Sequence, residues 1–378
     1  MKKFLHMLTG ILFLTAAMLS CSKDSSVVDG PGNEPQPIPG NGGGGQVPDS
    51  VYLVKVKAVL GIGSLIYDSV PARLKITSWD SAGMKNEKQV ELTAGINEIR
   101  LPKSHARYQL ELSKWGISEQ FQFTKNEIHE GSVITLGGTK NAKKLRREET
   151  YIFASGSYQP NGTVDYNYQA NGSLQSVVFF RKKPQQQDLQ LFMTDHYVYL
   201  NDRVTRIDRK DENNLDIGFT SFGYDAQGRI VQMRQTSYDQ QTDARLEYKY
   251  PAGFAQIKFF YQYNNGNSME YTVKVKGGNV VEDMARSSTG GGEGGSYDYD
   301  FGVNPYAHMN MPNIFLSNIS KNNLVSQDKG YSGSIPSGVP YKYEYTYDED
   351  GYPVQLLTSY KSYVTGEHLY VIKKHFIY

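Results

Sequence analysis

Alternating apolar and polar residues run through the chain from Val51 to residue 138. Leu74 and Ile76, for example, fall on the same side of an extended segment, and this period of two is typical of strands that lay one face on a core. Turn-forming residues separate seven such segments, which read VYLVKVKAVL, ARLKITSW, KQVELTAG, INEIRLP, RYQLELSKW, SEQFQFT and SVITLGG. Their number and spacing predict an immunoglobulin-like or transthyretin-like β-sandwich over residues 51–138.

From residue 150 onward, a recurring spacing accompanies the alternation. A tyrosine is followed by a glycine four positions later and an aliphatic residue six positions later. The spacing occurs in YQPNGTV (158–164), YQANGSL (168–174) and YDAQGRI (224–230). YDEDG (347–351) starts in the same way, but Pro353 then precedes Val354 and the register changes.

A single hairpin loop explains this spacing. In a type I turn followed by a left-handed residue, the glycine occupies the left-handed position because it has no Cβ to clash. Tyr224 then lies opposite Ile230, and an aromatic opposite a β-branched residue is a favourable cross-strand pair. The spacing predicts turn glycines at Gly162, Gly172, Gly228 and Gly351.

About a dozen strands of this kind predict one large antiparallel β-meander over residues 150–378. A sheet of that size curls, closes into a barrel or folds over. The stretch NPYAHMNMPNIFLSNISKNN, residues 304–323, breaks the alternation and predicts one short helix that caps or plugs the curved sheet. The chain contains 29 Tyr and 37 Gly, a composition that fits strands and tight turns. The predicted fold class is therefore mainly β.

The first residues have the layout of an export signal. Lys2 and Lys3 precede an apolar stretch and then small residues, so residues 1–20 are predicted to be a signal peptide. MLSC resembles the lipobox of bacterial lipoproteins, which implies that Cys21, the single cysteine of the chain, carries fatty-acyl chains such as palmitate. Several acyl chains on one residue make a durable membrane anchor. Residues 21–50 are rich in Gly, Pro and Ser and predict a disordered tether.

Two further resemblances concern the folded part. LPKSHARYQLELSKWGIS, VITLGG, NPYAH and SKNNLVSQ resemble uncharacterised surface or outer-membrane lipoproteins of Bacteroides-type bacteria. SKD after Cys21 resembles the export tags of such surface proteins. The resemblance implies an outer-membrane location with possible exposure at the surface, and that family has no assigned activity. The hairpin spacing is also similar to the YD repeats of Rhs-type proteins.

The chain shows no recognised catalytic, cofactor-binding or metal-binding motif. Its seven histidines form no metal-binding spacing, and no nucleophile-elbow sequence occurs. Asp348, Asp350 and Gly351 match only part of a calcium loop, so we interpret them as a turn. Beyond the signal the chain has 38 basic and 39 acidic residues, which gives no basic footprint for nucleic acid. Trp79 and Trp115 are interpreted as core residues, with a sugar-stacking platform as the alternative.

These observations favour a non-enzymatic lipoprotein that binds or scaffolds at the cell envelope. Its partners would be the membrane, through lipid on Cys21, and a glycan, a peptide or a protein, since tyrosine offers both area and a polar tip. Two alternatives stay open. One is a glycan hydrolase with two carboxylates about 5–10 Å apart. The other is a small-ligand or lipid carrier with a closed barrel and an apolar lumen.

Overall fold

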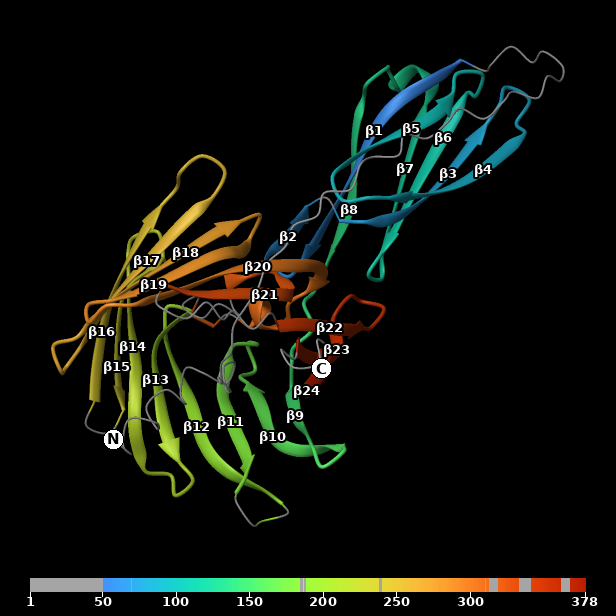
Figure 1. Ribbon diagram of the computed structural model, residues 1–378. Coiled ribbons are helices and arrows are strands. Elements are labelled where there is room, and N and C mark those ends of the chain that lie inside the picture. Colours follow the sequence, from blue (N-terminus) through green and yellow to red (C-terminus); the bar gives the residue numbers. More distant parts are fainter. Residues whose placement is uncertain are drawn as a thin grey trace, which may run out of the picture.

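The computed structural model describes residues 50–68, 70–183, 186, 188–237, 240–309, 311–312, 319–332, 341–361 and 368–378. The predicted signal peptide, Cys21 and nearly all of the tether lie outside these residues. Figure 1 shows two β-rich units, a small one formed by the first strands and a large one formed by the rest. Within the described residues, no helix is long and apolar enough to span a bilayer.

The small unit consists of two four-stranded sheets that share one core. Its elements are β1 (Val51–Ile62), β2 (Leu65–Asp68), β3 (Ala72–Trp79), β4 (Lys85–Leu92), β5 (Ile96–Pro102), β6 (Arg107–Lys114), β7 (Ile117–Thr124), the 3-10 helix η2 (Lys125–Glu127) and β8 (Val133–Lys140). One sheet has the order β2-β1-β5 with β8 parallel to β1, and the other has the order β4-β3-β6-β7. Leu74, Leu110 and Leu136 are fully buried between them.

The seven strands predicted over residues 51–138 are present, and β2 is an additional strand. The finer assignment, immunoglobulin-like or transthyretin-like, stays a prediction.

The large unit is a closed barrel of sixteen antiparallel strands. They are β9 (Arg147–Ala154), β10 (Ser157–Tyr168), β11 (Leu174–Lys182), β12 (Leu189–Leu200), β13 (Arg203–Asp211), β14 (Asp216–Tyr224), β15 (Ile230–Ser237), β16 (Gln240–Lys249), β17 (Ala255–Tyr263), β18 (Ser268–Lys276), β19 (Asn279–Ser287), β20 (Gly292–Val303), β21 (Asn322–Ser332), β22 (Tyr341–Tyr347), β23 (Pro353–Lys361) and β24 (His368–Ile377). Each strand pairs with the next, and β24 pairs with β9 to close the sheet. The predicted meander therefore takes the barrel form.

Alternation along each strand separates the inside of the barrel from the outside. In β12, Met193, Asp195 and Tyr197 are buried, whereas His196 and Val198 between and after them are exposed. The inward side chains of successive strands pack into one cluster, which includes Tyr166, Phe222, Phe259, Val273 and Leu356. The interior is thus a packed and largely apolar core.

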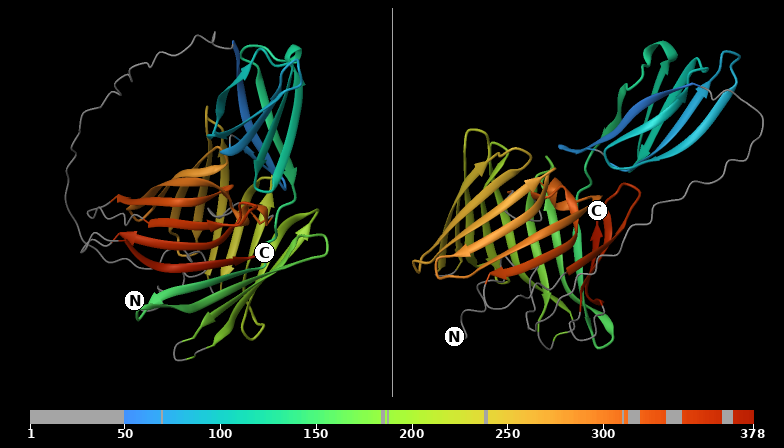
Figure 2. Two further views of the ribbon diagram at one scale, coloured as in Figure 1. Left: turned by 90° about the vertical axis from the view of Figure 1, so that its right-hand side faces the viewer. Right: turned by 45° about the horizontal axis from the view of Figure 1, so that its top comes forward.

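The segment predicted as a short helix contains the 3-10 helix η3 (Pro305–His308), between β20 and β21. Asn304 caps it by accepting the backbone N–H of Tyr306 at 3.1 Å. Tyr306 and Met309 pack against the interior cluster, so η3 and the residue after it contribute to the barrel core. Residues 310 and 313–318 of the predicted segment lie outside the described residues. The sandwich lies beyond the end of the barrel where η3 and the β22–β23 turn are found (Figure 2).

The hairpin loops at three of the four predicted glycines have the expected geometry. Gly172, Gly228 and Gly351 have φ values of 90, 79 and 81°. In the loop after Tyr224, the Asp225 N–H donates to the Arg229 carbonyl at 3.0 Å, and the Gly228 N–H donates to the Asp225 carbonyl at 3.0 Å. Tyr224 lies opposite Ile230, as the spacing predicts.

The turn predicted at Gly162 is wrong. Gly162 lies inside β10, where it pairs with Thr150 and Arg181, and the chain has already reversed at Ser155 and Gly156. A register irregularity next to Gly162 accommodates Pro160, as bulges commonly do. A Cβ on Gly162 would lie 3.0 Å from the carbonyl oxygen of Phe180, so the glycine permits a close strand approach here.

Candidate functional site

Three carboxylates are buried on the inner side of the barrel wall, and each has its own partner. Glu148 accepts a hydrogen bond from Lys374 Nζ at 2.7 Å and another from the Tyr306 hydroxyl. A buried charge needs such pairing to offset the loss of hydration. Burial, with the charge of Glu148 as the next cause, raises the pKa of Tyr306, so the phenol stays protonated as a donor.

The other two carboxylates follow the same rule. Asp195 receives two hydrogen bonds from Arg209, at 2.7 and 2.8 Å, in a bidentate pair. Asp283 accepts the Tyr271 hydroxyl at 2.6 Å. The described residues contain no group of three or more His, Cys, Asp and Glu placed to hold a metal ion. Each of these buried acids is thus held by a partner of its own, and none of the described contacts joins two of them directly.

Five tyrosines have a structural role at one end of the barrel, and two of them, Tyr168 and Tyr224, belong to the hairpin spacing. The hydroxyls of all five donate to backbone carbonyls of a neighbouring segment. The pairs are Tyr168 with Leu145 (2.8 Å), Tyr199 with Leu174 (2.8 Å), Tyr224 with Val204 (2.6 Å), Tyr248 with Ile230 (3.0 Å) and Tyr378 with Pro353 (3.0 Å). We call these five residues the rim tyrosines. They link successive hairpins, and each bond of this kind contributes about 1 kcal/mol.

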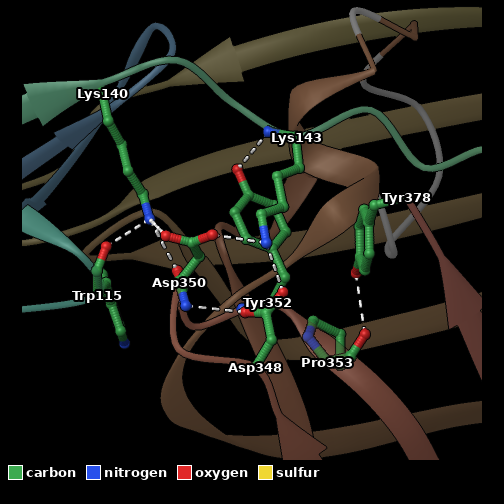
Figure 3. A network of polar contacts seen from close by, with 8 residues as sticks. All are labelled: Trp115, Lys140, Lys143, Asp348, Asp350, Tyr352, Pro353 and Tyr378. Carbon is green, nitrogen blue, oxygen red and sulfur yellow. Dashed lines mark hydrogen bonds and ion pairs between the residues drawn. The ribbon is translucent and has the colours of Figure 1, made fainter.

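Figure 3 shows the ionic part of the junction between the sandwich and the barrel. Lys140 Nζ, at the end of β8, donates to Asp350 Oδ1 at 2.8 Å and to the Trp115 carbonyl at 2.5 Å. Lys143 Nζ contacts Asp348 Oδ2 at 2.7 Å and Asp350 Oδ2 at 2.6 Å. The hydrogen bond from Lys140, followed by that from Lys143, lowers the pKa of Asp350. The acids that match part of a calcium loop are thus neutralised by two lysines, which supports the turn interpretation.

Trp115 belongs to this junction. Its indole is buried and meets the ring of Tyr67 edge-on at 5.4 Å, and it lies directly against Gly351. Trp79 is partly buried, and Arg107 lies over its ring at 4.7 Å. Trp115 is therefore a packing residue, as predicted, and the two tryptophans do not form a shared platform.

A second contact of the junction joins Tyr67 of the sandwich to η3. The Tyr67 hydroxyl donates to the Lys321 carbonyl at 3.0 Å and lies 3.0 Å from His308 Nε2. A phenol has one proton, so His308 Nε2 carries the proton of the second bond. Burial lowers the pKa of His308 to about 4. On β20, burial raises the pKa of Asp300 to about 6, although two backbone N–H groups bond it.

These two groups are expected to change stability in opposite directions on acidification. Asp300 binds a proton more readily in the folded state, so it adds stability as the pH falls from about 6 to 4. His308 binds one less readily, so stability is lost as the pH falls from 6.5 toward 4. Each contribution amounts to about 3 kcal/mol. Urea unfolding of Asp300→Asn and His308→Gln across this range measures both. Relative to wild type, the first should lose stability on acidification and the second should gain it; difference profiles of the same slope would contradict the assignment.

The outer side of the barrel wall is charged. Ion pairs join neighbouring strands across much of it, including Arg147–Asp165, Arg234–Asp243, Lys258–Glu270 and Lys274–Glu282, with N–O distances of 2.6 to 2.8 Å. Outward aromatic rings are covered by cations: Arg206 lies over Phe219 and Arg245 over Phe260, at 4.0 and 4.9 Å from the ring centres. The barrel wall thus carries mainly apolar side chains on its inner face and many ion pairs on its outer face.

One part of the outer wall gathers several aromatic rings. Tyr151 and Phe153 on β9, Tyr158 on β10 and Tyr370 on β24 face outward on three adjacent strands, which Figure 1 places near the lower right of the barrel. Phe153 and Tyr370 remain 48 and 40% exposed. We call these four residues the outer aromatic patch. Among the described surfaces it is the candidate binding site.

The comparisons with known proteins include solved structures with a partly similar fold. No family model and no curated protein matches this chain. A crystal structure of a porin-like protein from Bacteroides uniformis is similar with a TM-score of 0.45 at 10% identity, covering 62% of this chain and 98% of that one. A porin-like protein from Bacteroides vulgatus has a TM-score of 0.40 at 12% identity, covering 62% of this chain and 99% of that one. Similarities of this size transfer no function to this chain.

Proposed function

We propose that this chain is a non-enzymatic binding or scaffolding module of the cell envelope, tethered through lipid on Cys21, with its barrel in water. The lipobox-like sequence before Cys21 supports the tether. The resemblance to lipoproteins of Bacteroides-type bacteria supports an outer-membrane location. The partnered state of the buried acids supports a role other than catalysis.

The observation that carries this proposal is the ionic outer wall. A barrel that spans a membrane presents an apolar band about 25 Å tall to lipid, and an Arg or Lys at mid-bilayer costs about 2–4 kcal/mol. Arg234, Lys258 and Lys274 project from this wall in ion pairs. Water solvates such pairs, whereas lipid does not. The closed wall therefore acts as a soluble scaffold whose outer side is free to meet a ligand.

The carrier alternative has one observation in its favour, because the sheet does close around an apolar interior. The inward side chains nevertheless pack against one another and against η3. Two open pockets of about 260 Å³ each are bordered by β17–β19 and by the seam between β2 and the barrel end. An outward-facing ligand site is therefore the better supported of the two.

Exchange of the leader tests this proposal. Residues 1–21 are replaced by a secretion signal that is cleaved without attaching lipid. We expect the wild-type chain to sediment with membranes and to need detergent for release, because acyl chains hold it there. The exchanged chain should be recovered folded in the aqueous fraction. A folded chain that stays with membranes after the exchange, and resists carbonate or urea washing, would show that the barrel itself is inserted in lipid.

A further inference from the structure

The outer aromatic patch differs from the other aromatic positions on the wall. Phe219 and Phe260 are each covered by an arginine. In the patch, Phe153 and Tyr158 instead pack edge-to-face at 5.3 Å. The four rings of the patch lie on the adjacent strands β9, β10 and β24, and Phe153 and Tyr370 stay open to solvent.

A single cation serves two rings of this patch. Lys373 Nζ lies 4.9 Å from the ring centre of Tyr151 and 5.0 Å from that of Tyr158. Within the described part of the chain, no carboxylate lies within ion-pair distance of Lys373. Its neighbours Lys374 and His375 do face acids, Glu148 and Glu149. Lys373 therefore holds its ammonium group over two rings of the patch, with no ion-pair partner among the described residues.

Two tyrosine hydroxyls of the patch donate their protons to carboxylates, so their oxygen lone pairs stay available to accept a hydrogen bond from a ligand. Tyr151 donates to Glu149 at 2.9 Å, and Tyr370 donates to Glu344 at 3.3 Å. A phenol that donates its proton keeps lone pairs to accept a further hydrogen bond. The hydrogen bond to Glu149 raises the pKa of Tyr151, which keeps this hydroxyl neutral. The patch thus combines ring faces, hydroxyl acceptors and one ammonium group, and the carboxylates of Glu149 and Glu344 border it, each engaged by a tyrosine hydroxyl.

The sheet geometry limits how a ligand can bind here. β9 is paired on both sides, with β10 and with β24. An extended peptide gains its affinity at a sheet edge by adding a strand, and this wall has no open edge at the patch. Recognition must come from side chains alone. Sugar rings suit such a surface, because their C–H faces stack on aromatic rings and their hydroxyls donate to phenol oxygens.

We propose that the outer aromatic patch binds an acidic carbohydrate, with sugar rings on Phe153, Tyr158 and Tyr370 and a carboxylate or sulfate group on Lys373. This inference rests on the proposed function, since it requires the wall to face water. It narrows the ligand class from glycan, peptide or protein to an anionic oligosaccharide.

Calorimetric titration of the full lipidated chain in detergent tests the inference. Oligogalacturonate supplies carboxylates and a heparin-derived oligosaccharide supplies sulfates, while a neutral galacto-oligosaccharide of equal length is the uncharged comparison. We expect at least one acidic probe to bind, and Lys373→Met and Phe153→Ala each to weaken it by about tenfold or more, equivalent to about 1.4 kcal/mol. Arg245→Met, which removes a cation over a different outward ring, is the matched control and should leave affinity unchanged.

Several outcomes would overturn the inference. They are absence of binding by both acidic probes, an equal response to Lys373→Met and Arg245→Met, equal affinity for the neutral probe, or equal affinity for polyglutamate, which carries charge without sugar rings. Thermal unfolding of each variant verifies that the barrel is intact. A negative result here with successful release after leader exchange would remove the ligand class and leave the water-facing module in place.

Discussion

Replacing Lys374 by Met is expected to lower the free energy of unfolding by about 3–5 kcal/mol. Lys374 and Glu148 have side chains only 17 and 6% exposed, and their charged atoms lie 2.7 Å apart. Removing the ammonium leaves the carboxylate buried with only the Tyr306 hydroxyl as a partner. The pair also joins β24 to β9, the two strands that close the barrel. Urea unfolding followed by far-UV circular dichroism measures the loss.

The preceding residue in the chain provides a matched control. Lys373 points to the opposite face of the same strand, where it lies over outward tyrosines. Lys373→Met makes the same chemical change and should alter stability by only about 0.5 kcal/mol. Adding Glu148→Gln to Lys374→Met should restore much of the loss, because no buried charge then lacks its partner. Equal losses at positions 373 and 374 would contradict the inward placement of Lys374.

The strands themselves could be predicted because their signal is local. Alternation reveals which residues share a face, and the Tyr-to-Gly spacing specifies a loop whose bonds all lie within a few residues of Gly228. Closure of the sheet, in contrast, could not be predicted from local patterns. Lys374 and Glu148 are 226 positions apart, and nothing in either neighbourhood marks the other as its partner. The number of strands decides whether the first meets the last, and that is a property of the whole sheet.

The same reason explains why the outer aromatic patch could not be found from the sequence. The sequence shows Tyr151 and Phe153 on one face of a strand, but Lys373 reaches them only through the β9–β24 pairing.

At Gly162, a local sequence pattern predicts a turn that the structure does not contain. The segments around Gly162 and Gly172 share Tyr, Gln, Asn and Gly at the same positions. The chain nevertheless reverses at Gly156, too close before Gly162 for a second tight turn. A strand has to cross the wall before it can turn again.

The contacts at the junction between the sandwich and the barrel can be predicted only in part. The spacing of Asp348, Asp350 and Gly351 predicts a turn, and the loop has the expected left-handed glycine. That Lys140 and Lys143 neutralise the two acids depends on how the sandwich sits on the barrel. No sequence period reports such packing between units, because the contacts join loops and not repeating faces.

Replacing Gly351 by Ala is expected to destabilise the protein by about 2–5 kcal/mol, through backbone strain of about 1–2 kcal/mol and overpacking of about 1–3 kcal/mol. A Cβ at this position would lie 2.5 Å from Cδ1 and 2.7 Å from Cε2 of Trp115, so the indole would have to move. Movement of Trp115 disturbs the contact with Tyr67 and the Lys140 hydrogen bond to the Trp115 carbonyl. Unfolding free energy and tryptophan emission, the latter in a Trp79→Phe background, measure the two effects.

Gly266 separates strain from overpacking. Its φ of 84° matches the 81° of Gly351, but nothing lies within 4 Å of the position of its Cβ. Gly266→Ala should therefore cost only the backbone strain, about 1–2 kcal/mol, and leave the emission of Trp115 unchanged. Adding Trp115→Ala to Gly351→Ala makes room for the new methyl group, so in a double-mutant cycle the excess cost at position 351 should disappear. If Gly351→Ala costs no more than Gly266→Ala and emission stays the same, the indole does not rest on this turn, and the sandwich must be held on the barrel by the lysine–aspartate pairs and the Tyr67 contact with η3 instead.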